Sequence, residues 1–391
     1  MTFEQIEAQD QAYILHTYGR VDAALVKGRN ARAWDVDGKE YIDFTAGIGV
    51  NALGYSDPEW TAAVAEQAGK IQHMCNYYYC PENTALAQEL SQASGMAKAF
   101  FCNSGAEANE CAVKVARKYG EKRGAYKIVT LINSFHGRTL TTLAATGQAD
   151  FHRDFLPLTE GFLYAQAGDL AGVEALLDGS VCAVMLEMVQ GEGGVIPMDE
   201  DFVKGLAQLC REKDVLLIVD EVQTGVGRTG FFYAYQGYGV QPDVVTTAKG
   251  IAGGLPMGAC LVSERLGEIL KPGQQGSTFG GNPIASAAAR VVVRRVSDPA
   301  FLEDVRKKGA YLKEKLEAMP QVEYVRGRGL MLGVKLKEKD AHDVLTACAK
   351  EGLLILTAKE LVRFLPPLTI PQEDMDQGLA IFQRVLEQET Q

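Results

Sequence analysis

The chain has 391 residues, of which 47% are hydrophobic and 23% are charged, as in an ordinary soluble globular protein. Its formal net charge of −11 at pH 7 argues against nucleic acid as a main partner. No apolar stretch reaches the ~18 residues of a membrane helix, and the polar N-terminus resembles no export signal, so we expect a cytoplasmic protein without a membrane partner. The 8 cysteines include no C-x-x-C pair, which favours reduced thiols over a disulfide framework.

The first predicted element is a β-hairpin over residues 31–47, where ARAWDVDGKEYIDFTAG alternates around an Asp37-Gly38 turn. From about residue 84, helices alternate with short apolar strands, and helices are predicted over 105–120 and 199–214. The predicted strands are 98–104, 126–131, 181–189, 215–222, 243–248 and 258–263. Most are continuous apolar runs, as in strands buried on both faces. We therefore expect an α/β fold with a mostly parallel sheet covered by helices on both sides.

The sequence changes character again after about residue 286. A long helix, two strands, a further apolar segment and a closing helix are predicted, the strands and segment being 325–336, 353–358 and 361–368. These elements indicate a smaller α+β unit, which we expect the N-terminal hairpin to complete. The predicted organisation is a large domain over residues 49–286 and a small domain formed by both termini, residues 1–48 and 287–391.

Polar residues follow five of the predicted strands, and ligands of open α/β sheets bind at the carboxyl ends of strands. The five places are 104–106, 134–139, 190–194, Asp220 and Lys249. The small residues at 104–106 open a helix, whose free backbone N–H groups suit a phosphate. Asp220 directly follows an apolar run, where a buried acid needs a partner. Lys249 ends another such run and is followed at once by a glycine-rich loop, 250–258, that side chains leave clear.

Each of these features alone has an ordinary structural explanation. A helix start of small residues can be tight packing, Phe135 and His136 can be core and rim residues, and Lys249 can extend to solvent. Together they fit one cofactor, pyridoxal phosphate, which uses a Schiff-base lysine, an acid for its ring nitrogen, a phosphate cradle and a stacking aromatic ring. A nicotinamide dehydrogenase is excluded, because no G-x-G-x-x-G motif follows the first strand of a βαβ unit.

Residues 216–259, LLIVDEVQTGVGRTGFFYAYQGYGVQPDVVTTAKGIAGGLPMGA, resemble nearly end to end the cofactor signature of the class III (ornithine-type) aminotransferases, which have PLP-dependent transferase fold type I. Shorter stretches carry the same resemblance, which runs from about residue 10 to the C-terminus. They are WDVDGKEYIDFTAGIGVNALG, FCNSGAEANE, FHGRT, STFGGNP and VRFLPPL. The resemblance implies a large domain with a mostly parallel sheet and a smaller α+β domain.

The resemblance also implies how the cofactor is held. Lys249 would form the Schiff base and move the proton in catalysis, Asp220 would pair with the pyridine nitrogen, and Phe135 would stack on the ring. The backbone N–H groups of Gly105 and Ala106 would hold the phosphate. The remaining implied cofactor residues are Glu221, Val222 against the ring, Gln223 near the phenolic oxygen and Thr278, which would reach the phosphate of a neighbouring subunit. Shared sites of this kind imply a homodimer.

For the substrates, the resemblance implies that Arg138 and Arg363 take the carboxylates and that Glu192 holds Arg363 aside while the amino donor is bound. Ser277 would contact the amino substrate, and no metal is implied. The implied reaction moves the δ-amino group of N2-acetyl-L-ornithine to 2-oxoglutarate and gives N-acetyl-L-glutamate 5-semialdehyde and L-glutamate, a step of arginine biosynthesis.

Two alternatives stay open at this point. Another ω-aminotransferase of the same family, acting on ornithine, succinylornithine or 4-aminobutyrate, has the same motifs. A non-catalytic metabolite-binding protein on this scaffold is a different class, and the presence of both Lys249 and Asp220 counts against it. The sequence departs from the family pattern at Ala106, where threonine is frequent, and at Met188, where proline is usual. Neither departure touches the chemistry.

Overall fold

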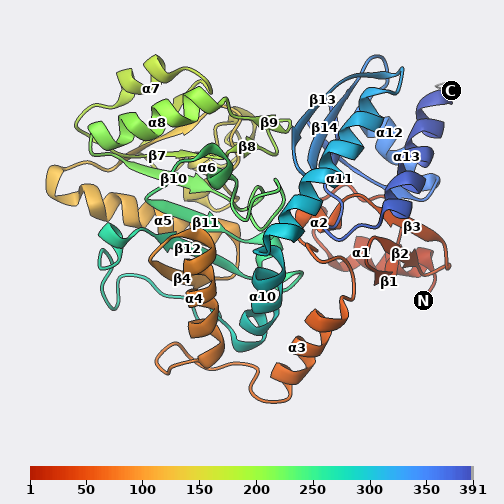
Figure 1. Cartoon of the computed structure of the whole chain (residues 1–391), viewed down its shortest axis with the longest axis horizontal. Helices are drawn as coiled ribbons and strands as arrows, with labels where there is room; N and C mark the ends of the chain where they lie inside the picture. Colours follow the sequence, from red (N-terminus) through yellow and green to blue (C-terminus); the bar gives the residue numbers. More distant parts are fainter. Residues whose placement is uncertain (389–391) are drawn as a thin grey trace.

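A seven-stranded sheet forms the centre of the computed structural model, which describes residues 1–388 (Figure 1). Its strand order is β4-β12-β11-β10-β7-β5-β6. The bounds are β4 (Lys98–Cys102), β5 (Lys127–Leu131), β6 (Phe162–Ala165), β7 (Val181–Leu186), β10 (Leu216–Asp220), β11 (Val244–Thr247) and β12 (Gly258–Val262). β12 runs antiparallel to both of its neighbours, and the other adjacent pairs are parallel. The predicted mostly parallel sheet is confirmed.

Helices cover both faces of this sheet, which explains why its strands are apolar without alternation. Ile218 of β10 belongs to a core cluster with the apolar face of α5 (Gly105–Gly120). The next residues along the strand on either side, Leu217 and Val219, belong to the cluster that contains the buried face of α8 (Glu200–Glu212). Because successive strand residues point to opposite faces, α5 and α8 lie on opposite sides of β10.

The remaining helices of the large-sheet region pack around its edges and loops. α10 (Pro283–Val296) packs against α3 (Pro58–Ala68) and α4 (Pro81–Ser94). Short elements connect the strands: α6 (Leu140–Ala145), α7 (Leu170–Leu176), α9 (Ala234–Tyr238), η1 (Glu121–Arg123), η2 (Ala149–Phe151), η3 (Lys249–Ala252) and η4 (Glu264–Leu266). A two-stranded ribbon joins β8 (Val189–Gln190) to β9 (Ile196–Pro197).

Two smaller sheets bring the ends of the chain together (Figure 1). The first contains β1 (Leu25–Arg29), β2 (Arg32–Asp35), β3 (Glu40–Asp43) and β15 (Leu353–Leu354), and the second contains β13 (Val322–Arg328), β14 (Met331–Leu336), β17 (Leu361–Phe364) and β16 (Leu356–Ala358). The other elements of the termini are α1 (Phe3–Tyr13), α2 (Ala46–Gly49), α11 (Pro299–Glu317), α12 (Ala341–Lys350) and α13 (Gln372–Glu387). The parallel pairing of β15 with β3 joins the N-terminal hairpin to the C-terminal part.

Two local predictions differ from the structure. The long helix after residue 286 is two helices, α10 and α11, because Asp298 caps a new helix and Pro299 occupies its first turn. The predicted strand 325–336 is a β13–β14 hairpin whose turn contains Gly329 at φ +54°. The predicted boundary at residue 286 falls inside α10. The last residues of the predicted small domain, 389–391, lie outside the described part of the chain.

Within residues 1–388, no helix combines the length and the apolar character that a bilayer crossing requires.

Candidate active site

A cavity of about 410 Å³ opens at the carboxyl ends of the central strands. Four of the five predicted strand-end segments line it. The fifth, 190–194, adjoins it through Glu192, which accepts a hydrogen bond from Gln223 of the cavity wall. The predicted residues that line the cavity are Gly105, Ala106, Phe135, Arg138, Asp220, Val222, Gln223 and Lys249. This volume suits a small-molecule ligand. The structure therefore brings most of the predicted strand-end residues together at one cavity.

Lys249 begins η3, with only Ala248 between it and β11, and it lines the cavity in a strained backbone conformation. Its φ of +45° is unfavourable for a residue with a Cβ and costs about 1–3 kcal/mol. Burial lowers the pKa of its amine below the ordinary value, and the charge of Arg363 adds to this, against the opposing effect of nearby carboxylates led by Glu192. The uncharged, nucleophilic form is therefore reached at lower pH than in a free lysine.

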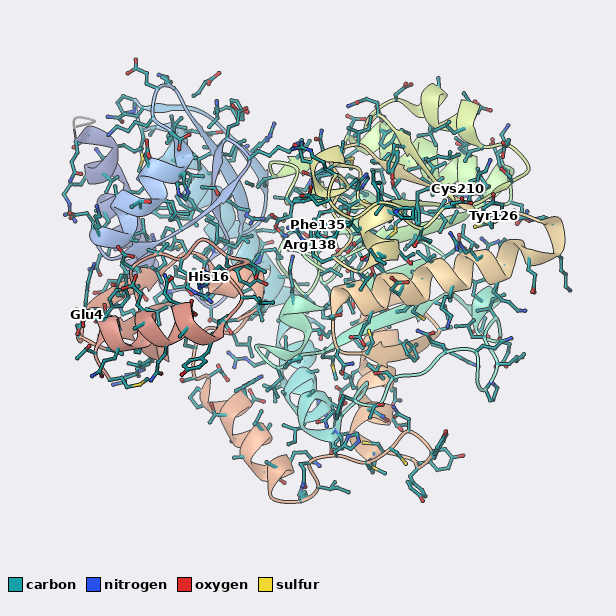
Figure 2. The ribbon with its side chains drawn as sticks, turned by 180° about the vertical axis from the view of Figure 1, so that it is seen from behind. Glu4, His16, Tyr126, Phe135, Arg138 and Cys210 are labelled. Atoms are coloured by element: carbon teal, nitrogen blue, oxygen red, sulfur yellow. The ribbon has the colours of Figure 1, made fainter. Side chains whose placement is uncertain are left out.

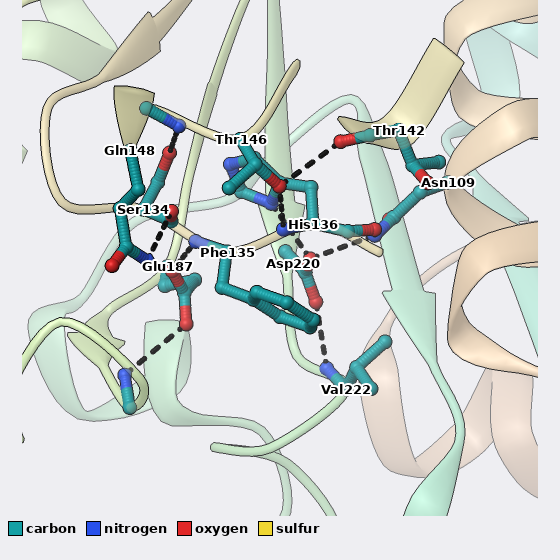
Figure 3. A network of polar contacts seen from close by, with 12 residues as sticks. Asn109, Ser134, Phe135, His136, Thr142, Thr146, Gln148, Glu187, Asp220 and Val222 are labelled. Carbon is teal, nitrogen blue, oxygen red and sulfur yellow. Dashed lines mark hydrogen bonds and ion pairs between the residues drawn. The ribbon is translucent and has the colours of Figure 1, made fainter. Parts of the chain in front are cut away.

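Asp220 ends β10, and three donors fix its carboxylate (Figure 3). His136 Nδ1 and Asn109 Nδ2 each lie 2.8 Å from Oδ2, and the backbone N–H of Val222 donates to Oδ1 at 3.0 Å. Because the carboxylate accepts, His136 carries its proton on Nδ1. Among the described residues, His136 Nε2 has no hydrogen-bond partner although it is buried.

The loop that carries Phe135 is held from two sides. Its backbone N–H donates to Glu187 Oε1 at 2.9 Å, and Gly191 N donates to Glu187 Oε2 at 3.2 Å (Figure 3). The next residue, His136, donates its N–H to Thr146 Oγ1 at 2.9 Å. Burial raises the pKa of Glu187 to about 7. Glu187 thus joins the loop with the aromatic ring to the loop that leads to Glu192.

An anion can be held where α5 begins. Ser104 caps this helix by accepting the N–H of Glu107 at 3.2 Å, which leaves the N–H groups of Gly105 and Ala106 without partners inside the helix. Gly105 is required here, because a Cβ on it would lie 2.7 Å from a methyl carbon of Val222. The helix dipole adds a further attraction for negative charge.

Arg363 of β17 is paired beside the cavity. Its Nη1 donates to Glu192 Oε1 at 2.6 Å and to Gln223 Oε1 at 3.2 Å, and Gln223 Nε2 donates to the same glutamate oxygen at 3.3 Å. Burial opposes the ionisation of Glu192, but the charge and hydrogen bond of Arg363 outweigh it and keep the pKa of Glu192 below its usual value. Met188, the departure from the family pattern, is fully buried and leaves this pair intact.

Arg138 lies at the mouth of the cavity and, unlike Arg363, forms no ion pair among the described residues. It is exposed, and its guanidinium carbon lies 4.2 Å from the ring centre of Phe151 and 5.4 Å from that of Phe135. Figure 2 shows Phe135 and Arg138 next to each other near the middle of the molecule. No carboxylate within residues 1–388 forms an ion pair with it, so its N–H groups are available to a ligand.

Besides Glu192 and Arg363, three further predicted residues do not line the cavity. Ser277 Oγ accepts from Asn103 Nδ2, which borders the cavity, at 3.2 Å. Thr278 is exposed on the surface and does not line this chain's own cavity. Glu221 is fully buried and accepts from Thr224 Oγ1 at 2.6 Å and from Tyr235 N at 2.9 Å. The structure does not bring Glu221 to the cavity, because its carboxylate completes the fold of its own loop.

The prediction missed two residues that shape the site, Asn109 and Glu187. Asn109 lies inside a helix, and the 3-residue spacing from Ala106 that turns it toward the cavity is shared by ordinary core positions. Glu187 comes directly after an apolar run, as Asp220 does. An acid at such a place is costly without a partner, so this position could have been predicted to belong to the site.

Comparison with known proteins identifies the family. The model of the family described as aminotransferase class-III matches residues 13–386. A protein of Haemophilus ducreyi named acetylornithine aminotransferase is 48% identical, with 99% of each chain covered. The succinylornithine transaminase of Yersinia enterocolitica is 44% identical, with 96% of this chain and 95% of that protein covered.

The solved structures agree. The crystal structure of ornithine aminotransferase from Toxoplasma gondii matches with a TM-score of 0.94 at 32% identity, over 99% of this chain and 95% of that one. This likeness confirms the predicted transferase fold of type I. The chain therefore belongs to the class III aminotransferases and is a transaminase that depends on pyridoxal phosphate.

Proposed function

We propose that this enzyme transfers the δ-amino group of N2-acetyl-L-ornithine to 2-oxoglutarate in arginine biosynthesis, giving N-acetyl-L-glutamate 5-semialdehyde and L-glutamate. The relative of Haemophilus ducreyi, named for this activity, supports the choice of donor. The observation that carries the proposal is the unlike state of two arginines beside one cavity. Arg138 is open to a ligand, whereas Arg363 is closed by Glu192 at 2.6 Å.

The residues present fit pyridoxal phosphate. Two residues of the cavity wall support this fit: His136 has a buried Nε2 without a hydrogen-bond partner among the described residues, and Gly105 lies so close to Val222 that no Cβ has room there. Lys249 would hold the cofactor covalently, and the start of α5 would hold its phosphate. When bound, pyridoxal phosphate supplies an electron sink for the electron pair released at the substrate carbon.

The side chains of the protein supply acid–base chemistry and orientation. The lowered pKa of Lys249 lets its amine accept a proton from the substrate carbon. The same group then donates this proton in a later step of the half-reaction. Asp220 is held at a fixed place by His136, Asn109 and the backbone of Val222, so that its carboxylate can face the pyridine nitrogen without reorganising.

The two arginines explain how one cavity accepts unlike substrates. The acetylated donor has one distant carboxylate, which Arg138 binds, and an uncharged methylene chain near the reacting carbon. Glutamate and 2-oxoglutarate bring a second carboxylate to that place, which Arg363 binds after leaving Glu192. An arginine left unpaired in a buried site is costly, so the ion pair suits the first half-reaction. Arginine binds a carboxylate through two N–H groups, which lysine cannot do.

Succinylornithine is a second candidate donor, because a relative at 44% identity is named succinylornithine transaminase. Ornithine and 4-aminobutyrate are further candidates. The deciding experiment measures kcat/KM for all four donors with 2-oxoglutarate as acceptor. We expect the highest value with N2-acetyl-L-ornithine. A higher value with any of the other three donors would reject the proposal, because each differs from N2-acetyl-L-ornithine in the group beside the carboxylate that Arg138 binds.

We also propose that the enzyme is a homodimer in which Thr278 completes the phosphate site of the partner. Thr278 is exposed, and next to it Phe279 is 61% exposed. Asn76 holds this loop by donating to the carbonyls of Ser277 and Gly280 at 3.0 Å each. Tyr77 of the same supporting segment is 96% exposed, and aromatic surface of this extent is typical of an interface.

The two-domain organisation predicted from the sequence is likewise a proposal. The pairing of β3 with β15 supports a small domain formed by both termini. The packing of α10 on α3 and α4 supports assigning that helix to the large domain.

A further inference from the structure

We propose that Phe151 is a positioning residue for the amino donor: its ring holds the guanidinium of Arg138 where that group binds the donor's carboxylate. The inference rests on the proposed function, in which Arg138 is the carboxylate-binding residue. It assigns a role to an aromatic ring that none of the sequence motifs includes.

The geometry of the three side chains carries the inference. The guanidinium carbon of Arg138 lies 4.2 Å from the ring centre of Phe151, well within the 6 Å range of a cation–π interaction. The rings of Phe151 and Phe135 meet edge to face, with centres 5.9 Å apart and planes at 75°. Phe135 lines the cavity, so a series of side-chain contacts runs from the cavity wall through Phe151 to the arginine at its mouth.

The backbone around Phe151 is fixed to the same helix end that supports the site. His152 Nε2, directly after it, lies 2.9 Å from Leu143 O and 2.7 Å from Thr146 O, both at the end of α6. Thr146 also accepts the backbone N–H of His136, which contacts Asp220. The ring of Phe151 therefore has a defined position relative to the central strands.

An aromatic contact holds Arg138 without occupying the N–H groups that an ion pair would occupy. Arg138 is exposed, and no acid within the described residues pairs with it. A ring below the guanidinium restricts its orientation but leaves its N–H groups, which lie in the plane, free to donate to a carboxylate. Arg363, in contrast, must first separate from Glu192. Arg138 can thus bind a carboxylate at any time, whereas Arg363 can do so only after its ion pair with Glu192 has broken.

The test measures binding of an unreactive donor analogue, N2-acetyl-L-norvaline, to the holoenzyme by calorimetry. This probe keeps the carboxylate and the acetamide and lacks the amino group. Phe151 is replaced in turn by 4-fluoro-, 3,5-difluoro- and 3,4,5-trifluorophenylalanine, which weaken the negative ring face stepwise at nearly constant shape. We expect the dissociation constant to rise with each fluorine, by about tenfold over the series. The same series at Phe155, which is exposed in the same loop, is the control and should stay flat.

Two further variants separate this role from a structural one. Phe151→Trp should keep the wild-type affinity, whereas Phe151→Leu should raise KM for N2-acetyl-L-ornithine about tenfold with kcat nearly unchanged. A dissociation constant that is flat across the fluorinated series overturns the inference. So does an equal effect of Phe151→Leu in wild-type and Arg138→Ala backgrounds, since the ring then acts without the arginine. If Arg138→Ala itself leaves binding unchanged, the proposed role of Arg138 fails, and the inference fails with it.

Discussion

Lys249 combines two features that a purely structural lysine avoids. Its backbone is held at a φ of +45°, and its amine is removed from water inside the cavity. Both cost free energy in the folded protein without cofactor, because the left-handed conformation is strained and burial disfavours the charged form. Residues that destabilise the fold in this way mark places where function, rather than stability, determines the choice of side chain.

The lowered pKa of Lys249 gives a prediction on the stability of the apoenzyme. Between the folded-state pKa and the unfolded value of 10.5, the unfolded chain binds more protons, so stability rises with pH across that window. Lys249→Met removes this dependence. We expect the variant apoenzyme to have a higher Tm than the wild type at pH 7, with the difference shrinking as the pH approaches 10.5.

Calorimetry or circular dichroism across this pH range measures the effect. Lys204→Met, at an exposed position of α8, is the matched control and should show no such convergence. A Tm difference for Lys249→Met that is independent of pH would show that burial does not perturb the amine.

At this scale the sequence predicted the residues whose chemistry is visible at strand ends. Lys249 and Asp220 could be found because a charged group directly after a buried apolar strand is costly without a purpose. The contacts that fix them could not. The pairing of Asn109 with Asp220 spans 111 positions, and it depends on how α5 packs on the sheet. Conversely, the sequence placed Glu221 in the site, whereas packing turns its side chain into the core.

Among the elements, α5 is the one that defines the cofactor site. Its first turn faces the cavity, and its apolar face packs on the sheet across β10 and its neighbours. The position of this helix start is therefore set by the core and cannot adjust easily to a change at the cavity. A glycine at its first position removes the clash that any Cβ would make with Val222.

Gly105→Ala should therefore weaken cofactor binding. The new Cβ would lie 2.7 Å from Val222 Cγ1, and overpacking of this kind costs about 1–3 kcal/mol. We expect the dissociation constant of pyridoxal phosphate, from titration of the apoenzyme, to rise by at least about tenfold. Gly179→Ala, where the added carbon meets nothing within 4 Å, is the control. Equal affinities of the two variants would contradict the proposed phosphate cradle.

Elements were predictable where one local signal dominates. The helix over 105–120 was predicted with the bounds that α5 has, because a strand, small residues and Gly120 enclose an amphipathic run. The break between α10 and α11 was missed although Asp298 and Pro299 signal a helix start, because the apolar periodicity continues on both sides. The β13–β14 turn at Gly329 was missed because its flanks read as one continuous strand.

At the scale of the whole molecule, the site depends on parts of the chain that are distant in sequence. Arg363 belongs to β17 of a smaller sheet, whereas Glu192 and Gln223 follow strands of the central region. The pairing of β15 with β3 links the two ends of the chain in that smaller region. Such long-range pairing leaves no local pattern, so the sequence indicated Glu192 as a partner of Arg363 only through family resemblance and did not indicate Gln223.

The proposed dimer predicts complementation between two defective chains. Thr278→Ala should raise the dissociation constant of pyridoxal phosphate about tenfold or more, since it removes a hydrogen bond to a charged group. Lys249→Ala should be inactive but keeps Thr278. In a mixed dimer, the intact Lys249 of one chain receives Thr278 from the other, so half of the sites regain wild-type affinity. Activity at limiting cofactor that stays at the level of the Thr278→Ala homodimer would show that the site is not shared.

The exchange of Arg363 between Glu192 and a substrate carboxylate is the central claim, and Glu192→Gln tests it most directly. Loss of the glutamate charge frees Arg363, so the half-reaction with glutamate should become more efficient and that with N2-acetyl-L-ornithine less efficient. Single-turnover rates for each half-reaction measure both values. Glu360→Gln, which removes an exposed ion pair with Lys335, is the control and should leave their ratio unchanged. We expect the ratio of the two efficiencies to shift toward glutamate by at least about tenfold in Glu192→Gln. A ratio equal to that of the wild type would contradict the account.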